Sequence, residues 1–186
     1  MDGGLDLDFH GFTRLFRSRK LLNRNEFDLC RRFYLLMREF LPLPDLIVRL
    51  YADERLAAYA YNYMGQVVTG RPAAKQLAAL LLDTSKDELE HQQELAERIA
   101  SLGGMPVADV SKLVETSNDG YPTPPANEKD FEAIVRTVIK AERDAIEAYN
   151  QLAQKIHGKD PITYNLIIHI LSEEVEHEDE FENLLG

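Results

Sequence analysis

Four stretches of the chain place apolar residues at alternating spacings of three and four, and each stretch carries a glutamate inside its apolar stripe. A stripe of this kind is the buried face of an amphipathic helix. The glutamates are Glu54, Glu88, Glu142 and Glu174, and each lies near the middle of its stretch. Four unpaired carboxylates in an apolar core would be strongly destabilising. The pattern therefore predicts an all-α four-helix bundle in which two divalent metal ions neutralise the buried carboxylates.

Two of these glutamates are followed three residues later by a histidine, in the steps Glu88–His91 and Glu174–His177. Residues three apart share a face of a helix, so each step offers one oxygen and one nitrogen ligand to a single point. One such step is a weak signal, and a lone glutamate such as Glu54 can equally be a solvated residue. Two steps and two further glutamates, all in phase, form a much more specific pattern. We therefore predict six metal-binding and catalytic residues: Glu54, Glu88, His91, Glu142, Glu174 and His177.

The six residues are expected to differ in their roles. A carboxylate can bridge two ions, whereas an imidazole binds one. We expect Glu54 and Glu142 to be terminal ligands, each on one ion together with a histidine, and Glu88 and Glu174 to be the bridges. Mixed oxygen and nitrogen ligands with open positions favour iron or manganese over a closed structural zinc site.

Three further residues are candidates for hydrogen bonds to these ligands. A metal-bound imidazole needs an acceptor that fixes its orientation. Asp87 and Glu173 directly precede the two bridging glutamates; across an antiparallel pair, Asp87 would reach His177 and Glu173 would reach His91. Both acids can equally be ordinary exposed residues. Tyr61 lies two turns beyond the first glutamate on the same face, where it would donate to a ligand, supply an electron or simply pack.

Capping and stop residues delimit the four predicted helices. The helices are expected from Asp45 to about Thr69, from Pro72 to Leu102, from the Asn127–Asp130 cap to Gly158, and from Asp160 to Gly186. Asp45 and Asp160 are expected N-caps, and Pro72 and Pro161 occupy first-turn positions that proline tolerates. The connection at 103–127 is long and rich in proline, and residues 109–116 within it can form a short helix.

Length and composition indicate one bundle domain preceded by a shorter segment. The chain has 186 residues, of which 45% are hydrophobic, enough for a sizeable core. We assign residues 1–42 to an N-terminal arm with a short helix at 25–41, and residues 43–186 to the bundle. The lone cysteine, Cys30, excludes an internal disulfide and a cysteine-rich metal site. Neither a secretory signal nor an apolar run of ~20 residues is present, so we expect a cytoplasmic protein without membrane contact.

The net charge of −11 is unevenly distributed. Residues 1–42 carry 8 basic and 6 acidic residues, and the remainder carries 13 and 26. An acidic body disfavours a nucleic-acid-binding core and suits the attraction of small cations. The basic residues of the first segment cluster at Arg14, Arg17, Arg19, Lys20 and Arg24. Such an arm can contact DNA phosphates without reading sequence, remain solvated, or pack on a neighbouring subunit.

The two short links and single long crossover resemble the connectivity of the ferritin-like superfamily. The similarity covers residues 45–185 and includes the ferritin and bacterioferritin type of di-iron site within one subunit. The long crossover and the stretch from Gly158 to Glu178 are similar to the Dps-like mini-ferritins. This resemblance implies a hollow homo-oligomer, most simply a dodecamer, that oxidises ferrous iron with hydrogen peroxide or O2 and stores ferric mineral. It also implies two iron ions per subunit, with manganese or zinc as substitutes.

Three departures restrict the resemblance. Bacterioferritins place a haem-ligating methionine where this chain has Leu89, so we expect no haem. Some Dps-like proteins carry a cysteine pair where this chain has Asp144 and Ala153, which excludes that thiol chemistry. True Dps proteins have their site between subunits, so their DNA role does not transfer automatically. Two alternatives to iron storage stay open: a nucleoid-coating protein that protects DNA, and a di-iron or di-manganese peroxidase without storage.

Overall fold

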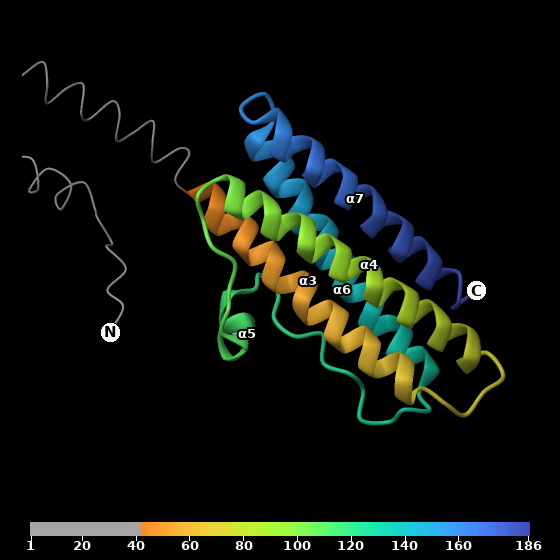
Figure 1. The fold of residues 1–186 in the computed structure, drawn as a ribbon. Coiled ribbons are helices and arrows are strands. Elements are labelled where there is room, and N and C mark those ends of the chain that lie inside the picture. The colour runs from red at the N-terminus through yellow and green to blue at the C-terminus, as the bar shows by residue number, and fades with distance from the viewer. Residues whose placement is uncertain (1–41) are drawn as a thin grey trace, which may run out of the picture. The chain divides into compact units, whose positions relative to one another are not determined.

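The computed structural model describes residues 42–186, and all regular secondary structure in this range is helical (Figure 1). The four long helices are α3 (Pro42–Val67), α4 (Ala74–Ser101), α6 (Phe131–Ile156) and α7 (Pro161–Glu182). The prediction of an all-α four-helix bundle is therefore confirmed. The predicted arm, the helix at 25–41 and Cys30 lie outside the described residues. Among the described helices, none has the length and apolar character needed to span a membrane.

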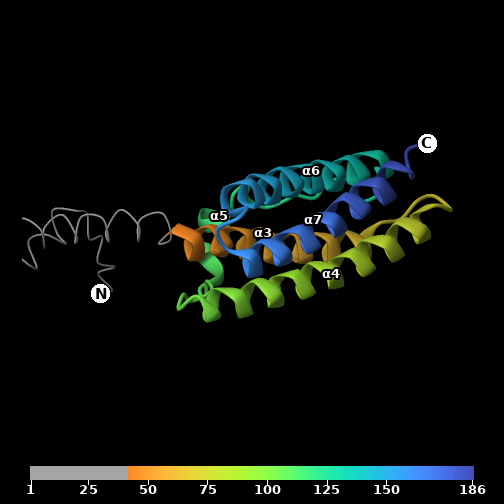
Figure 2. The ribbon, with the colours of Figure 1, turned by 90° about the horizontal axis from the view of Figure 1, so that it is seen from above.

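The helices form two antiparallel pairs, α3 with α4 and α6 with α7, joined by one long crossover (Figures 1 and 2). The crossover returns along the bundle from the end of α4 to the start of α6, so α6 runs antiparallel to α3, and α7 antiparallel to α4. This is the connectivity predicted from the link lengths. The short helix expected at 109–116 is present as a 3₁₀ turn, η1 (Val110–Lys112), followed by α5 (Leu113–Thr116).

The core of the bundle is built from the predicted apolar stripes. Side chains such as Ile47, Leu77, Val138 and Ile170 are fully buried. Burial of one large aliphatic side chain contributes about 1.5–3 kcal/mol. The apolar positions therefore stabilise the association of the helices, and they leave the glutamates on the same stripes available for another role.

The crossover packs on the bundle through only some of its apolar residues. Leu113 is buried against Ala52 of α3, and Val107 packs against the same small cluster. By contrast, 76% of Val110 and 56% of Val114 are exposed. Leu113 and Val107 therefore cover the chain's own bundle, whereas Val110 and Val114 remain largely exposed.

Two of the expected helix starts are correct and two are wrong. Asp130 and Asp160 cap α6 and α7 through their carboxylates, as predicted. Asp45 is not an N-cap, because α3 already begins at Pro42 and Asp45 lies in its first turn. Pro72 does not start α4, because a turn closed by the Ala74 N–H and the Arg71 carbonyl precedes the helix.

Replacing Asp160 with alanine is expected to destabilise the protein by about 1–2 kcal/mol, near the upper end for a helix cap. Asp160 accepts hydrogen bonds from the backbone N–H groups of Ile162 and Thr163 and forms an ion pair of 2.6 Å with Arg98. Asp130→Ala is the matched control, because Asp130 accepts one backbone hydrogen bond, from Ala133. Urea denaturation of both variants measures the difference. Equal losses would show that the contact with Arg98 adds nothing.

Candidate metal centre

The six predicted ligands all lie in the core, midway along the bundle. Glu54 comes from α3, Glu88 and His91 from α4, Glu142 from α6, and Glu174 and His177 from α7. The glutamates are 1–2% exposed, and the two histidines are 2% and 7% exposed. The structure therefore brings together all six residues that were predicted from their positions on the apolar stripes. Their binding of metal remains a prediction.

Their potential ligand atoms form two groups, and within each group the atoms lie within 4.8 Å of one another. The first group is Glu54, Glu88, His91 and Glu174; the second is Glu88, Glu142, Glu174 and His177. Glu88 and Glu174 belong to both groups. Each group is completed by one further glutamate and one histidine. Two carboxylates shared by two otherwise separate groups are the arrangement that a dinuclear centre with bridging carboxylates requires.

One nitrogen of each imidazole faces this cluster of carboxylates. His91 Nδ1 lies 3.0 Å from Glu174 Oε1, 3.4 Å from Glu88 Oε2 and 3.6 Å from Glu54 Oε2. His177 Nδ1 lies 3.6 Å from Glu174 Oε2 and 3.7 Å from Glu88 Oε1. Nδ1 is therefore the nitrogen that each histidine can offer to a metal ion.

The other nitrogen of each imidazole faces an acid on the opposite helix. His91 Nε2 lies 2.8 Å from Glu173 Oε2, and His177 Nε2 lies 3.4 Å from Asp87 Oδ2. These are the two pairs that the antiparallel arrangement suggested. An Nε2–H that donates to a carboxylate leaves the Nδ1 lone pair directed at the cluster, which is the tautomer a metal ligand needs.

The cluster contains most of the unsatisfied polar atoms in the described core. These buried atoms without a hydrogen-bond partner are Glu88 Oε1, His91 Nδ1, Glu142 Oε1, both Oε atoms of Glu174, His177 Nδ1 and, outside the cluster, Glu94 Oε2. A buried polar group without a partner costs about 1–3 kcal/mol. All the orphaned atoms of the cluster are potential metal ligands, so the donor set fits two divalent cations.

Without metal, the buried carboxylates compete for protons and for the imidazoles. Burial, and then repulsion from Glu174, raises the pKa values of both Glu88 and Glu142. Burial also acts to raise the pKa of Glu174, but contacts with His177 and His91 outweigh it and lower the pKa to about 2. Burial acts to lower the pKa of each histidine, but the neighbouring carboxylates raise it overall. The metal-free cluster therefore holds protons in the positions that metal ions would occupy.

Two buried tyrosines contact the outer glutamates. Tyr149 of α6 donates a hydrogen bond to Glu54 Oε1 on α3, and Tyr61 of α3 contacts Glu142 on α6. Tyr61 was among the predicted contacts of the ligands, whereas Tyr149 was not. The signal was present, because Tyr149 follows Glu142 by seven residues just as Tyr61 follows Glu54. The two tyrosines thus contact the two glutamates that each belong to only one ligand group, in a reciprocal arrangement between α3 and α6.

Comparisons with known proteins agree with this fold and site. The model of the family described as Ferritin, ferritin-like domain, matches residues 45–186. A relative from Pyrococcus furiosus, called a DNA protection during starvation protein, is 32% identical over 145 residues, which are 77% of this chain and 76% of the relative. The chain therefore belongs to the ferritin-like family, and within it is a homologue of the Dps proteins.

Solved structures give the same fold. The Bacteroides fragilis bacterioferritin-related protein, described as a dodecameric thioferritin, has a TM-score of 0.73 and 32% identity, covering 77% of this chain and 83% of its own. Listeria monocytogenes Dps has a TM-score of 0.71 at 17% identity, covering 77% and 92%. Vibrio cholerae Dps, described as a ferritin-like diiron-carboxylate protein, has a TM-score of 0.72 at 15% identity, covering 80% and 92%. The last two share the fold alone.

The stability of the metal-free protein is expected to fall as pH rises from about 5 to about 8. Glu88, Glu142 and both histidines have raised pKa values in the folded chain. A group with a raised pKa binds more protons when folded, so its contribution is lost as pH rises from its unfolded value towards its folded one. The lowered pKa of Glu174 acts oppositely, but only below its ordinary value of 4.5.

Bound metal should remove this dependence, because the ligands then bind cations in place of protons. Thermal denaturation at several pH values, with and without saturating Co²⁺, measures both effects. The metal-loaded protein serves as the control for titrating groups elsewhere. If the melting temperature changed equally with pH in the metal-free and metal-loaded forms, the assignment of these protons to the cluster would be contradicted.

Proposed function

We propose that the protein oxidises ferrous iron with hydrogen peroxide or O2 at a dinuclear centre within each subunit and stores the ferric product. The observation that carries this proposal is the pair of ligand groups sharing Glu88 and Glu174. The ferritin-like family and the diiron-carboxylate description of the Vibrio cholerae relative support iron as the metal. The donor set agrees, because carboxylates with imidazoles and open positions suit iron or manganese.

The carboxylates of the centre would supply negative charge, and the pairs of glutamate and histidine would fix the positions of the two ions. Four carboxylates would balance the charge of two divalent ions, and Glu88 and Glu174, which belong to both ligand groups, would also stabilise the more highly charged ferric product. Glu54 with His91 would hold one ferrous ion, and Glu142 with His177 the other. Each ferrous ion gives up one electron, and one hydrogen peroxide molecule takes both and becomes two hydroxide ions. The contacts from Asp87 and Glu173 keep the imidazoles in place throughout.

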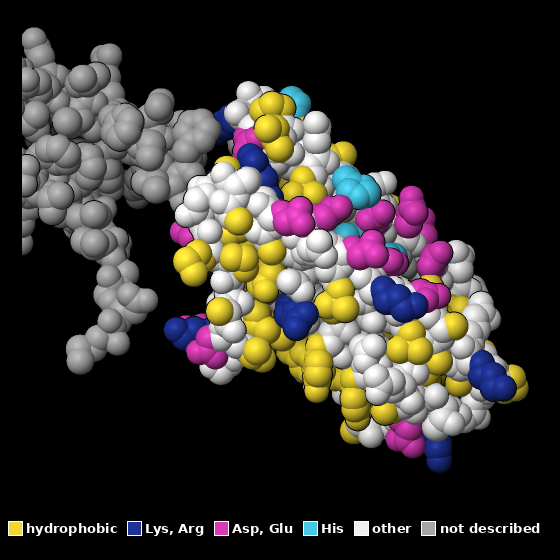
Figure 3. All heavy atoms as spheres, in the orientation of Figure 1, with side chains coloured by type: hydrophobic (Ala, Val, Ile, Leu, Met, Phe, Trp, Pro, Cys, Tyr) yellow, Lys and Arg dark blue, Asp and Glu magenta, His cyan; other side chains and the backbone are white. Residues whose placement is uncertain are grey.

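The acidic surface supports a function with cations. Acidic side chains gather over α7 and its border with α4 (Figure 3). At this border Glu173 of α7 contacts His91, and Asp87 of α4 contacts His177. A surface of one sign raises the local concentration of ions of the other sign. Ferrous ions would be concentrated beside the helices that carry both Glu-x-x-His steps.

Anaerobic titration with Fe²⁺, followed by addition of peroxide or O2, tests the proposal. We expect two ferrous ions per chain to bind and to be oxidised together in the first turnover. Continued additions should then load hundreds of ferric ions into a soluble particle. Oxidation without loading would favour a di-iron or di-manganese peroxidase. Binding of zinc alone, with no oxidation of iron, would contradict the proposed reaction.

A second function is favoured by the name of the Pyrococcus furiosus relative, a DNA protection during starvation protein. The basic residues that would contact DNA phosphates lie at positions 14–24 of this chain, outside the described residues. Retention of DNA in a gel at low salt, lost at high salt and on deletion of residues 1–24, would support direct DNA binding. Protection of DNA without such retention would instead follow from the removal of iron and peroxide.

A further inference from the structure

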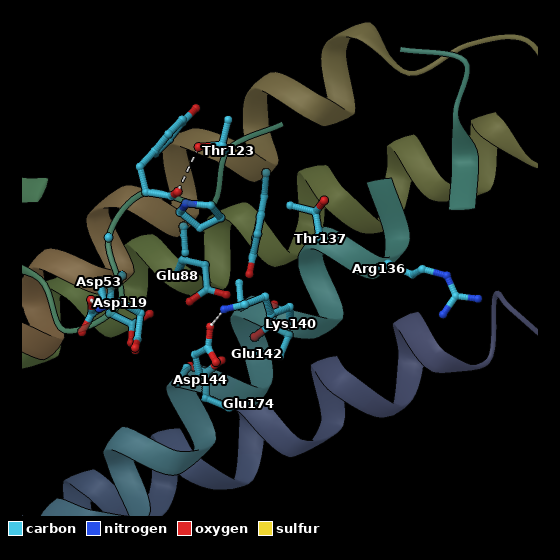
Figure 4. Close-up of a pocket in the computed structure, with 18 residues that line it drawn as sticks. Asp53, Glu88, Asp119, Thr123, Arg136, Thr137, Lys140, Glu142, Asp144 and Glu174 are labelled. Carbon is cyan, nitrogen blue, oxygen red and sulfur yellow. Dashed lines mark hydrogen bonds and ion pairs between the residues drawn. The ribbon is translucent and has the colours of Figure 1, made fainter. Parts of the chain in front are cut away.

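All four glutamates of the cluster line a cavity of about 470 Å³ beside α3, the crossover and α6. Figure 4 shows Glu88, Glu142 and Glu174 pointing toward one another in this cavity. His91 and His177 do not belong to the lining. They come from α4 and α7 and contact acids across the border of these two helices. The residues that fix the two imidazoles therefore belong to α4 and α7.

The two helices present their histidines in nearly the same sequence, Asp-Glu-Leu-Glu-His ending at His91 and Glu-Glu-Val-Glu-His ending at His177. The first acid of each sequence faces the histidine of the other helix. Glu173 Oε2 lies 2.8 Å from His91 Nε2, whereas the shorter Asp87 places its Oδ2 3.4 Å from His177 Nε2. An N–H···O hydrogen bond normally spans about 2.7–3.2 Å. Only the glutamate therefore makes a hydrogen bond of ordinary length.

The residues one helical turn earlier add to this difference. His169 precedes Glu173 by four residues, and its Nε2 lies 3.8 Å from the same Oε2 that contacts the opposite histidine. The corresponding residue before Asp87 is another acid, Asp83, which is paired with Lys86 at 2.7 Å. Like charges four residues apart on a helix repel one another. Glu173 thus has an imidazole where Asp87 has a like charge.

The inner sides of the two imidazoles differ in the same sense. His91 Nδ1 lies 3.0–3.6 Å from oxygens of three carboxylates, and His177 Nδ1 lies 3.6–3.7 Å from oxygens of two. His91 is 2% exposed and His177 is 7% exposed. Contacts on both nitrogens therefore hold His91 more closely than His177.

We propose that Glu173 is a positioning residue that makes the two metal positions of the centre unequal. The ion beside His91 would enter first and be held more tightly than the ion beside His177. An imidazole already held in the orientation that a metal ion requires loses less freedom when the ion binds. The proposal rests on the proposed function only in naming Fe²⁺ as the natural ion.

This inequality would decide when oxidation begins. A chain with one ferrous ion can supply one electron, whereas the reduction of hydrogen peroxide to two hydroxide ions takes two. The concentration of Fe²⁺ at which a chain becomes able to reduce peroxide would therefore be set by the weaker position, beside His177. Asp87, rather than Glu173, would then control that threshold.

Titration of the metal-free, full-length protein with Co²⁺, followed by visible absorbance and calorimetry, tests the proposal. His177→Ala leaves the position beside His91 with its histidine, and His91→Ala leaves the other position with its histidine. Loss of a residue that orients a metal ligand typically lowers metal affinity about 10–100-fold. Since Asp87 is displaced rather than missing, we expect His177→Ala to bind its first Co²⁺ about 10-fold more tightly than His91→Ala.

Exchanging the lengths of the two acids assigns the difference to them. Glu173→Asp in the His177→Ala protein should weaken Co²⁺ binding about 3–10-fold, and Asp87→Glu in the His91→Ala protein should strengthen it by a similar factor. Glu173→Asp in the His91→Ala protein should change the affinity less than about twofold, because the acid then faces no imidazole. Glu176→Asp is the matched control, an exposed acid of α7 that belongs to neither ligand group.

Equal Co²⁺ affinities in the two histidine variants would overturn the proposal. An affinity of the His177→Ala protein that is the same with Glu173→Asp as with Glu176→Asp would also overturn it, because Glu173 would then have no positioning role. Co²⁺ binding needs no oxidation of iron, so the two proposals fail separately. Unequal positions in a protein that never oxidises Fe²⁺ would contradict the ferroxidase activity alone, and equal positions in an active ferroxidase would contradict the role of Glu173 alone.

Discussion

Replacing either proposed bridging residue, Glu88→Gln or Glu174→Gln, is expected to lower the initial rate of Fe²⁺ oxidation at least 100-fold. Loss of a residue that merely orients a ligand typically costs about 10–100-fold, and these two residues belong to both ligand groups. Glutamine preserves the shape of the side chain but removes its charge and one anionic oxygen, so it cannot bridge two cations. Stopped-flow oxidation assays, with Fe²⁺ binding measured anaerobically, give the rate and the remaining stoichiometry.

The matched controls are Glu90→Gln and Glu176→Gln, two residues farther along the same helices. Both side chains are exposed and belong to neither ligand group, so oxidation should remain close to wild type. The metal-free Glu88→Gln protein should melt at or above the temperature of the metal-free wild type, because a neutral amide removes repulsion between buried carboxylates. Normal oxidation in both bridging variants would reject the dinuclear assignment.

The sequence predicts the fold and the candidate ligands for one shared reason. The spacing that marks an apolar stripe also fixes which polar residues face the core. Glu54 and Glu142 were recognisable only because they interrupt such stripes. The contacts of Asp87 and Glu173 followed from the antiparallel order of two helices with similar steps. Local patterns were sufficient wherever a regular helix made the spacing of residues along the chain determine which way their side chains point.

The remaining features depend on contacts that no local pattern encodes. Pro72 fits a helix start, but the link from α3 is tightened by the Thr69 N–H, which donates to the carbonyl of Glu128 on the crossover. The crossover is held against α3 by Asp53, which accepts hydrogen bonds from Asn118, 65 residues away. The contact of Tyr149 was not predicted, since its partner Glu54 lies on another helix, 95 residues away. In each case an irregular segment or a distant helix supplies the partner.

The largest expected effect outside the centre concerns assembly. We expect the protein to sediment as a closed particle of about 254 kDa, which is twelve copies of the 21.2 kDa chain. The Bacteroides fragilis relative, 32% identical, is described as dodecameric. A single bundle would oxidise iron but has nowhere to retain the ferric product, so storage requires a closed shell. Closed point-group symmetry is also the usual outcome for identical soluble subunits.

The crossover supplies a surface on which assembly can be tested. Val110 and Val114 are exposed on η1 and α5, and apolar residues grouped at a surface commonly mark a protein contact. The double variant Val110→Glu/Val114→Glu is expected to sediment as much smaller species, because it would place buried charges in a contact. Glu115→Gln, in the same short helix, is the control and should sediment like wild type. Circular dichroism shows whether the helices survive in the double variant.

Separate measurements of oxidation and sedimentation then divide the proposed function into its two parts. The six proposed ligands all lie within one bundle, so the dissociated double variant should still oxidise its first two Fe²⁺ ions per chain while failing to retain hundreds. Such a result would assign oxidation to the bundle and storage to the shell. A wild-type protein that remains a monomer or dimer in analytical ultracentrifugation, at any concentration and after iron addition, would leave the oxidation chemistry intact and remove the support for storage.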